Sequence, residues 1–129
     1  MFHYHHTKYF LLFHLFIVCL FAQHSHGNRG GKKMPAVCEI KGTVVDSTTG
    51  FPIEYASISV LDYDGDVITG GVSDADGFFH IREINPGHYD VKIEFMGFKA
   101  YQIEEVELSM RGERSKDLGQ IVLTLVFIQ

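Results

Sequence analysis

Between Val37 and Val126 the sequence alternates apolar and polar residues in short runs, and this pattern constrains the fold more than any other feature. In the clearest run, His88–Phe95, every second side chain is apolar. A period of two is typical of half-buried β-strands, and no segment of this region keeps a helical period. The side chains of that run expected to face the core are Tyr89, Val91, Ile93 and Phe95. The pattern predicts an all-β fold.

Turn residues separate these runs at intervals of about 8–12 residues, a spacing that favours a sandwich of short strands. Asp64-Gly65 is a strong hairpin signal, and Asp74–Gly77 is a second Asp-Gly turn. Asn85-Pro86-Gly87 is a third, because proline presets φ for a turn. We expect seven strands, at residues 39–46, 55–62, 67–73, 78–82, 88–95, 98–108 and 120–126. Together they predict a single antiparallel seven-stranded β-sandwich.

The first 22 residues differ from the rest of the chain. Residues 9–22 read YFLLFHLFIVCLFA and are apolar except for His14. This run is short for a membrane span, which needs about 20 apolar residues, and it matches the apolar part of a secretory signal peptide, here preceded by Lys8. We therefore expect a helical signal peptide at residues 1–22, a flexible linker at 23–36 and the β-sandwich at 37–126. An uncleaved anchor and a wrongly assigned start codon are the alternatives.

Charge and motifs exclude several functions. The net charge is -5, and residues 1–22 hold one of the eleven Lys and Arg and none of the sixteen Asp and Glu, so the remainder carries -6. This argues against nucleic-acid binding, which needs a clustered positive surface. The sequence lacks GxSxG, HExxH, P-loop and GxGxxG motifs, so we expect no enzymatic activity and no cofactor. A length of 129 residues leaves room for one domain.

Two sequence features have the residue types of a metal site but lack its full pattern. His24 and His26 form an HxH pair without further ligands nearby. Asp62 begins an acidic turn, but a calcium-binding EF-hand loop starting there needs Gly at its sixth position and Glu at its twelfth, where the chain has Val67 and Ser73. We expect no metal at either place.

The acidic turns and two histidines are the remaining metal candidates. Asp64 could join Asp74 and Asp76 in a surface calcium site. Turns need Asp and Gly for their own geometry, however, so we assign these residues to the turns. His80 and His88 are expected to face outward from different strands, which does not make a zinc site.

The cysteines do not predict a disulfide. The chain has two, Cys19 and Cys38, and cleavage of the signal peptide would leave Cys38 alone. An exported domain without disulfides depends on its hydrophobic core. We expect Cys38 to be a small core or edge residue.

A series of short motifs between Gly42 and Tyr101 is similar to those of a known family. The motifs are Gly42 with Val44 and Asp46, Thr49-Gly50 with Pro52, Ala56-Ser57-Ile58, Ser73-Asp74, Asp76-Gly77-Phe78-Phe79, Pro86-Gly87-His88-Tyr89 and Gly97-Phe98. In this order and spacing they resemble the carboxypeptidase-regulatory-like domain, which has a transthyretin-like (prealbumin-like) sandwich fold. Asp117–Leu125 suits the closing strand of that family.

The resemblance implies a context more than a chemistry. Similar domains follow the catalytic domain of D-type metallocarboxypeptidases and are not themselves catalytic. In TonB-dependent receptors of Bacteroidetes and related outer-membrane barrel proteins, they stand directly after the signal peptide. The order of signal, linker and domain in this chain is that of the receptors. Because plug, barrel and energy-coupling box have no counterpart here, we expect the soluble front module of such a protein, truncated or free-standing.

Three functions stay open at this point. The first is a non-catalytic exported accessory module on the periplasmic side of a bacterial outer membrane, with a protein partner in the cell envelope. The second is a secreted sandwich that binds carbohydrate or a cell-surface partner, which would be supported if Tyr55, Tyr63 and Tyr101 formed an exposed cluster. The third is an accessory domain of a metallocarboxypeptidase. No catalytic, cofactor-binding or metal-binding residue is assigned under any of them.

Overall fold

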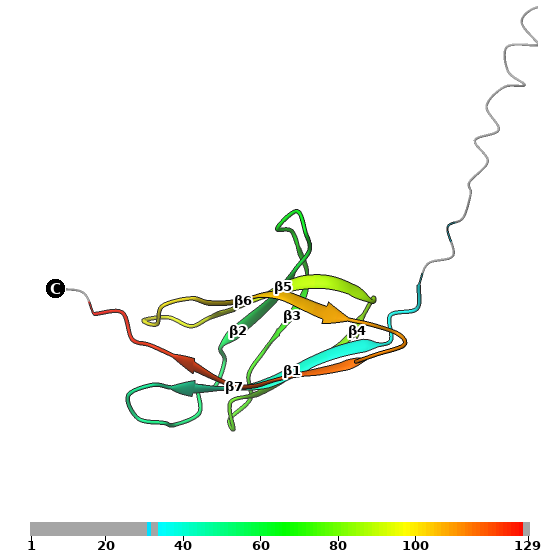
Figure 1. Ribbon diagram of the computed structural model, residues 1–129. Coiled ribbons are helices and arrows are strands. Elements are labelled where there is room, and N and C mark those ends of the chain that lie inside the picture. Colours follow the sequence, from blue (N-terminus) through cyan, green and yellow to red (C-terminus); the bar gives the residue numbers. More distant parts are fainter. Residues whose placement is uncertain (1–30, 32–33, 128–129) are drawn as a thin grey trace, which may run out of the picture. The chain divides into compact units, whose positions relative to one another are not determined.

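The computed structural model describes residue 31 and residues 34–127, which form seven strands (Figure 1). The strands are β1 (Cys38–Asp46), β2 (Ser57–Leu61), β3 (Val67–Val72), β4 (Phe78–Ile84), β5 (Gly87–Glu94), β6 (Tyr101–Leu108) and β7 (Ser115–Leu123). Within the described residues no helix is long and apolar enough to cross a membrane. The predicted signal peptide and most of the predicted linker lie outside the described residues.

The strands form two sheets that pack against each other (Figure 1). β1 lies between β4 and β7 in a three-stranded sheet, and the four-stranded sheet has the order β3-β2-β5-β6. This confirms the predicted seven-stranded β-sandwich. The expectation of purely antiparallel pairing fails for one pair, because β1 and β7 run parallel. These two strands come from opposite ends of the domain, so no hairpin turn fixes their relative direction.

Most strand boundaries differ from the predicted ones by one to five residues; β6, for example, begins at Tyr101 and not at residue 98, and β7 ends at Leu123 and not at residue 126. Two of these differences have a clear local reason. β7 begins at Ser115, whereas the sequence predicts a polar loop through Lys116 and a strand only from Gln120. The polar start of β7 is extended because it pairs with the central strand β1, where Glu39 is opposite Ser115. β2 begins two residues later than predicted, at Ser57. Tyr55 has a φ of 63°, outside the range of regular extended backbone, so the chain turns there before the strand begins.

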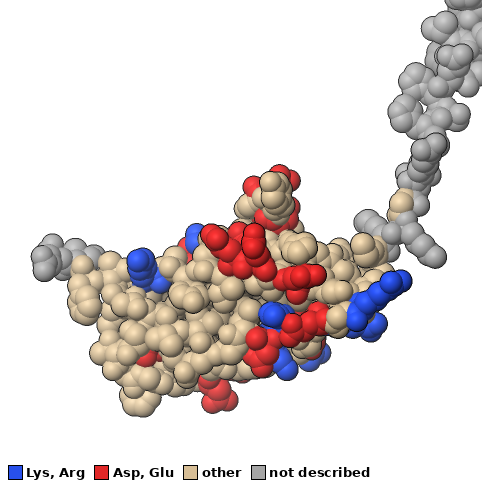
Figure 2. Space-filling model, viewed as in Figure 1, with Lys and Arg blue, Asp and Glu red and all other residues tan. Residues whose placement is uncertain are grey.

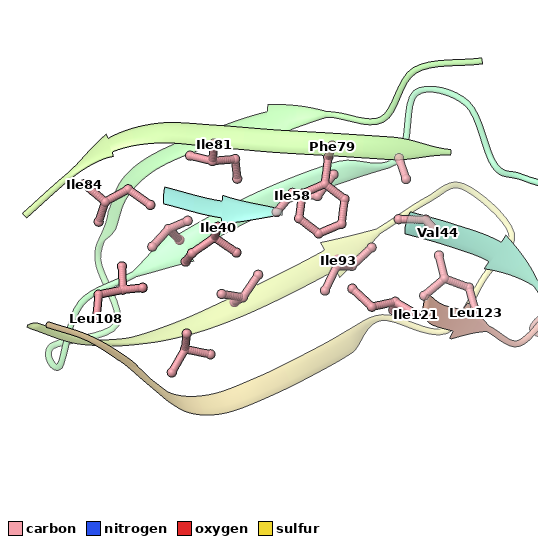
Figure 3. Packing of buried hydrophobic residues seen from close by; sticks show 14 of the residues in the cluster. Ile40, Val44, Ile58, Phe79, Ile81, Ile84, Ile93, Leu108, Ile121 and Leu123 are labelled. Carbon is pink, nitrogen blue, oxygen red and sulfur yellow. The ribbon is translucent and has the colours of Figure 1, made fainter. Parts of the chain in front are cut away.

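The core lies between the two sheets and is filled mainly by aliphatic side chains around Phe79 (Figure 3). Val91 and Ile93 of β5 are fully buried, as the alternation predicts. Tyr89 and Phe95 pack against the core while keeping part of their surface exposed. Burying one large apolar side chain stabilises a fold by about 1.5–3 kcal/mol, so this core is the main source of stability.

Two small residues of β1 take part in the packing. Cys38, predicted to be a small core or edge residue, is 1% exposed and lies in the core. Gly42 lies against the ring of Phe79, and a Cβ at that position would be 2.8 Å from the ring atom Cζ. The close approach of β1 to this ring therefore requires a glycine.

Ser73 is a buried polar residue directly after β3. Its hydroxyl donates a hydrogen bond to the carbonyl of Ile53 at 2.6 Å and accepts one from the amide of Ala56 at 2.9 Å. Its own amide donates to the carbonyl of Ala56, and its carbonyl accepts from the amide of Tyr55. Buried backbone groups need such partners. Ser73 thus joins the end of β3 to the segment that precedes β2.

Candidate functional site

The outer edge of β3 is the part of the surface best suited to binding another polypeptide. β3 ends the four-stranded sheet, with β2 on one side and, among the described residues, no hydrogen-bonded strand on the other. It contains no charged residue and no proline, and Val67, Ile68 and Val72 are 63%, 45% and 61% exposed. Natural sheets commonly protect an edge with charges or proline. Here only a shift in register beside Leu61 interrupts the edge.

Two glycines leave the middle of β3 without side chains. A Cβ at Gly70 would lie 2.4 Å from the carbonyl oxygen of Ile58, so the close approach of β2 requires glycine there. A Cβ at Gly71 would reach only an ordinary contact, 3.7 Å from Cγ1 of Ile81. At both positions the backbone lacks the cover that a side chain would give it.

Acidic turns flank β3 at both ends. Five aspartates occupy them: Asp62, Asp64 and Asp66 in the β2–β3 hairpin, and Asp74 and Asp76 in the β3–β4 turn. Figure 2 shows acidic side chains on the hairpin that projects from the sandwich in Figure 1. Residues 42–81 contain no Lys or Arg, so no basic residue from the adjoining sequence offsets this negative charge.

Two of these aspartates shape their own turns. Asp62 Oδ1 accepts hydrogen bonds from the amides two and four residues later, at 3.0 and 2.9 Å, and Asp74 Oδ1 does the same at 3.0 and 2.9 Å. The turns lie at opposite ends of β3, which spans about 20 Å, so Asp64 does not meet Asp74 and Asp76. In the part of the chain that the structure describes, no three His, Cys, Asp or Glu side chains are placed to hold a metal ion.

A polar network lies on the outer face of the three-stranded sheet. His80 Nε2 is 2.7 Å from Oε2 of Glu39, and Arg82 Nε donates to His80 Nδ1 at 3.3 Å. Since Nδ1 accepts, Nε2 carries the proton that is donated to Glu39. Both ring nitrogens are therefore occupied by structural hydrogen bonds, and neither is free to act as a base.

The same network holds Glu39 ionised. Hydrogen bonding from Ser115, followed by that from His80, lowers the pKa of the Glu39 carboxyl below its ordinary value. The His80 contact is the better defined of the two, because the Ser115 hydroxyl has no hydrogen bond of good geometry within the described residues. The network ties β1 to both of its neighbours in the sheet.

A hollow of about 560 Å³ opens between the β2–β3 hairpin and strands β5 and β6. Its lining residues are Asp62, Tyr63, His88, Tyr89, Asp90, Glu104 and Glu105. Asp90 is already engaged, since it accepts from the amide of Glu105 at 3.0 Å and from Nε2 of Gln102 at 3.2 Å. No serine or cysteine lines the hollow beside His88, so it does not contain the hydroxyl or thiol nucleophile that Ser- or Cys-dependent hydrolases use. His80 lies on β4 and His88 on β5, so the two histidines are on different strands, as the sequence predicts, and the structure places these strands in different sheets.

Sequence reasoning missed this hollow. Glu105 has a φ of 56°, and the pairing of β5 with β6 shifts register between Tyr89 and Val91. A bulge of this kind re-aims nearby side chains. Its position depends on the pairing of two strands, and the sequence gives no signal for it beyond adjacent Glu104 and Glu105.

The three tyrosines proposed as an aromatic cluster are exposed but not brought together. Tyr55, Tyr63 and Tyr101 are 69%, 99% and 46% exposed. Tyr55 precedes β2 and Tyr63 follows it, so the length of the strand separates them. Tyr101 begins β6, which is two strands away from β2. These three tyrosines therefore do not form the exposed aromatic cluster that would have supported carbohydrate binding.

Comparison with known protein families decides the identity of the domain. The carboxypeptidase regulatory-like domain matches residues 39–123, well over half of the chain and nearly the whole span of the seven strands. This chain belongs to the carboxypeptidase regulatory-like domain family. Membership confirms the resemblance carried by the motifs between Gly42 and Tyr101. No curated protein matches the chain.

Several solved structures share the fold. A chain of the type II cohesin–X–dockerin complex of Acetivibrio cellulolyticus matches with a TM-score of 0.56 and 19% identity, over 68% of this chain and 58% of that one. The major pilin subunit of Bacillus cereus matches with a TM-score of 0.55 and 17% identity, over 70% of this chain and 30% of that one. The 5-hydroxyisourate hydrolase of Klebsiella pneumoniae matches with a TM-score of 0.52 and 21% identity, over 66% of this chain and 90% of that one. The regulatory-like domain thus spans less than two thirds of the first two chains, and at these identities the likeness concerns the fold alone.

Proposed function

We propose that this regulatory-like domain is a non-catalytic, exported accessory module that binds a protein partner in the bacterial cell envelope. The observation that carries the proposal is the edge of β3, which is apolar, uncharged and unpaired among the described residues. Edges of this kind bind polypeptides by accepting an additional strand. The apolar run at residues 9–22 supports export.

The proposed context is the one that the resemblance implies. The chain would be the N-terminal periplasmic domain of a TonB-dependent receptor or a related barrel protein, or a separately encoded version of that domain. Sequencing the DNA beyond the codon for Gln129 tests this. A plug-and-barrel reading frame that continues nearby would support the receptor, whereas an intergenic stop would favour a free-standing secreted module.

The absence of catalysis is proposed on the geometry of the two histidines. Both ring nitrogens of His80 are engaged, and no Ser or Cys lines the hollow beside His88. The sharpest test uses 5-hydroxyisourate, since a hydrolase of that compound shares the fold. We expect the chain to leave the rate of hydrolysis at the uncatalysed value. Turnover above that rate, lost in His80→Ala or His88→Ala, would contradict the proposal.

Affinity capture tests the interaction itself. The full chain is immobilised and exposed to an envelope extract of the producing organism, beside Val72→Lys on β3 and the matched control Val122→Lys on β7. Both valines are exposed, at 61% and 44%, so neither change disturbs the core. We expect one envelope protein to be retained by the wild type and the control but not by Val72→Lys. If no bait retains an envelope protein, the proposed function is wrong.

A further inference from the structure

We propose that the free edge of β3 binds an extended, uncharged segment of a partner protein that carries Lys or Arg at both of its ends. The bound segment would become a fifth strand of the four-stranded sheet. This inference rests on the proposed function and names the partner by its chemistry.

The backbone of β3 provides the affinity. In a paired strand, alternate residues direct their N–H and C=O groups to each side. β2 satisfies one side of β3, and the other side has no strand beside it within the described residues. Because Gly70 and Gly71 have no side chains, an incoming backbone can approach the middle of β3 closely.

The side chains of β3 select an uncharged segment. Val67 and Val72 are exposed near the two ends of the strand, at 63% and 61%. By the register with β2, in which Ser57 is opposite Val72, these valines share the outer face of the sheet with Ser57 and Ser59. Apolar or β-branched side chains of an added strand would cover the valines, since cross-strand neighbours on one face contact each other.

The charges decide between a partner and a second copy of the chain. Antiparallel pairing of two β3 edges would place the Asp62–Asp66 hairpin of one copy beside Asp74 and Asp76 of the other. Parallel pairing would place identical acidic turns side by side. Like charges across an interface oppose association, so both self-pairings are disfavoured. A segment with basic ends faces the two acidic turns instead.

The structure also sets the spacing of the basic residues. Asp66 and Asp74 are the first acidic residues outside β3 on either side and are eight positions apart. At about 3.4 Å per residue, an extended chain covers that separation in about 27 Å. The basic residues of the partner should therefore also be about eight positions apart, with uncharged residues between them.

Synthetic peptides test the inference with the full chain. The first peptide has nine residues, with Lys at both ends and seven alternating Thr and Val between them; the second has Glu at both ends and the same middle. Binding is followed by the fluorescence anisotropy of the labelled peptide. We expect the Lys peptide to bind at least about tenfold more tightly at low ionic strength, with the difference shrinking as salt screens the charges. Equal affinities of the two peptides would overturn the assignment of basic ends.

Backbone methylation of the Lys peptide tests strand addition without altering the protein. N-methyl groups are placed on every second residue, in one peptide on the even positions and in another on the odd positions. An added strand donates hydrogen bonds to β3 from one set only, so one peptide should lose binding and the other keep it. Equal behaviour of both peptides would overturn strand addition.

Hydrogen exchange locates the site. We expect the bound Lys peptide to slow the exchange of amides in Val67–Val72, and protection confined to β4, β6 or β7 would contradict the choice of edge. The variant Asp66→Asn with Asp76→Asn removes one carboxylate from each acidic turn and keeps Asp62 and Asp74, which form the turns. It should weaken binding about three- to tenfold, as expected for weaker charge pairing at both exposed ends of the peptide. The matched change Glu104→Gln with Glu107→Gln on β6 should leave binding unchanged.

The two proposals fail in different ways. An envelope protein that the chain captures but that the Lys peptide does not displace would overturn the β3 inference and leave the proposed function standing. Sedimentation of the chain as a dimer that Val72→Lys dissociates would show that a second copy occupies the edge, and would likewise overturn the inference alone.

Discussion

Ser73 is the buried polar residue of the described core, and its side chain makes two hydrogen bonds to the backbone. Its hydroxyl donates to the carbonyl of Ile53 and accepts from the amide of Ala56. Ser73, Ile53 and Ala56 are all buried, so water cannot take the place of the hydroxyl. We expect Ser73→Ala to lower the free energy of unfolding by about 1–3 kcal/mol, because two backbone groups lose a buried partner. Urea unfolding measures the change. Ser57→Ala, at an exposed serine of β2, should alter stability by less than about 0.5 kcal/mol.

Glu39 should make stability depend on pH in the acidic range. Its pKa in the folded state is lowered from the ordinary value of 4.5 by Ser115 and then by His80. The contribution of ionised Glu39 to the free energy of unfolding is thus fully present above pH 4.5. It is lost as the pH falls through the lower pKa of the folded state. We expect Glu39→Gln to flatten the fall in the free energy of unfolding between about pH 5 and pH 3. Glu54→Gln, at an exposed loop position, is the control, and an unchanged slope in Glu39→Gln would contradict the role of the network.

At the scale of elements, the packing of β1 against the Phe79 side chain of β4 depends on Gly42. A methyl group there would press on the ring of Phe79 and come within 3.2 Å of the carbonyl of Gly119. We expect Gly42→Ala to destabilise the domain by about 1–3 kcal/mol, as overpacking of a filled core does. Gly71→Ala, with only an ordinary contact, is the control. In the double variant Phe79→Leu with Gly42→Ala, the loss of free energy of unfolding should be smaller than the sum of the losses in the two single variants. If the two losses simply add, contact with the Phe79 ring is not the cause of the destabilisation by Gly42→Ala.

The elements also show where sequence reasoning succeeds. The strand at residues 88–95 was predictable because Tyr89 to Phe95 alternate without interruption, and β5 occupies nearly the same residues. The start of β7 was not predictable, because Ser115 to Gly119 are mostly polar or glycine. They form a strand only because they pair with β1. The open edge of β3 had no sequence signal of its own either, because an edge is defined by the absence of a neighbouring strand.

At the scale of the whole molecule, Cys38 reports on cooperative unfolding. It is 1% exposed in the core, and a thiol reacts only when a reagent reaches it. We expect the alkylation of Cys38, followed by mass spectrometry of its peptide, to be slow in buffer and to accelerate with urea in step with global unfolding. Rapid alkylation in buffer would show that the β1 end of the sandwich opens locally.

The sequence alone determined that this chain forms a seven-stranded sandwich, because alternation and turn chemistry act between residues close in the chain. The family was indicated by the resemblance of the motifs between Gly42 and Tyr101, and the match over residues 39–123 shows it. Tertiary structure decided which strands became neighbours. It set β1 parallel to β7, buried Ser73 beneath the segment before β2, and left β3 at an edge between two acidic turns. Those features arise from contacts between residues distant in the sequence, and the proposed binding surface is made of them.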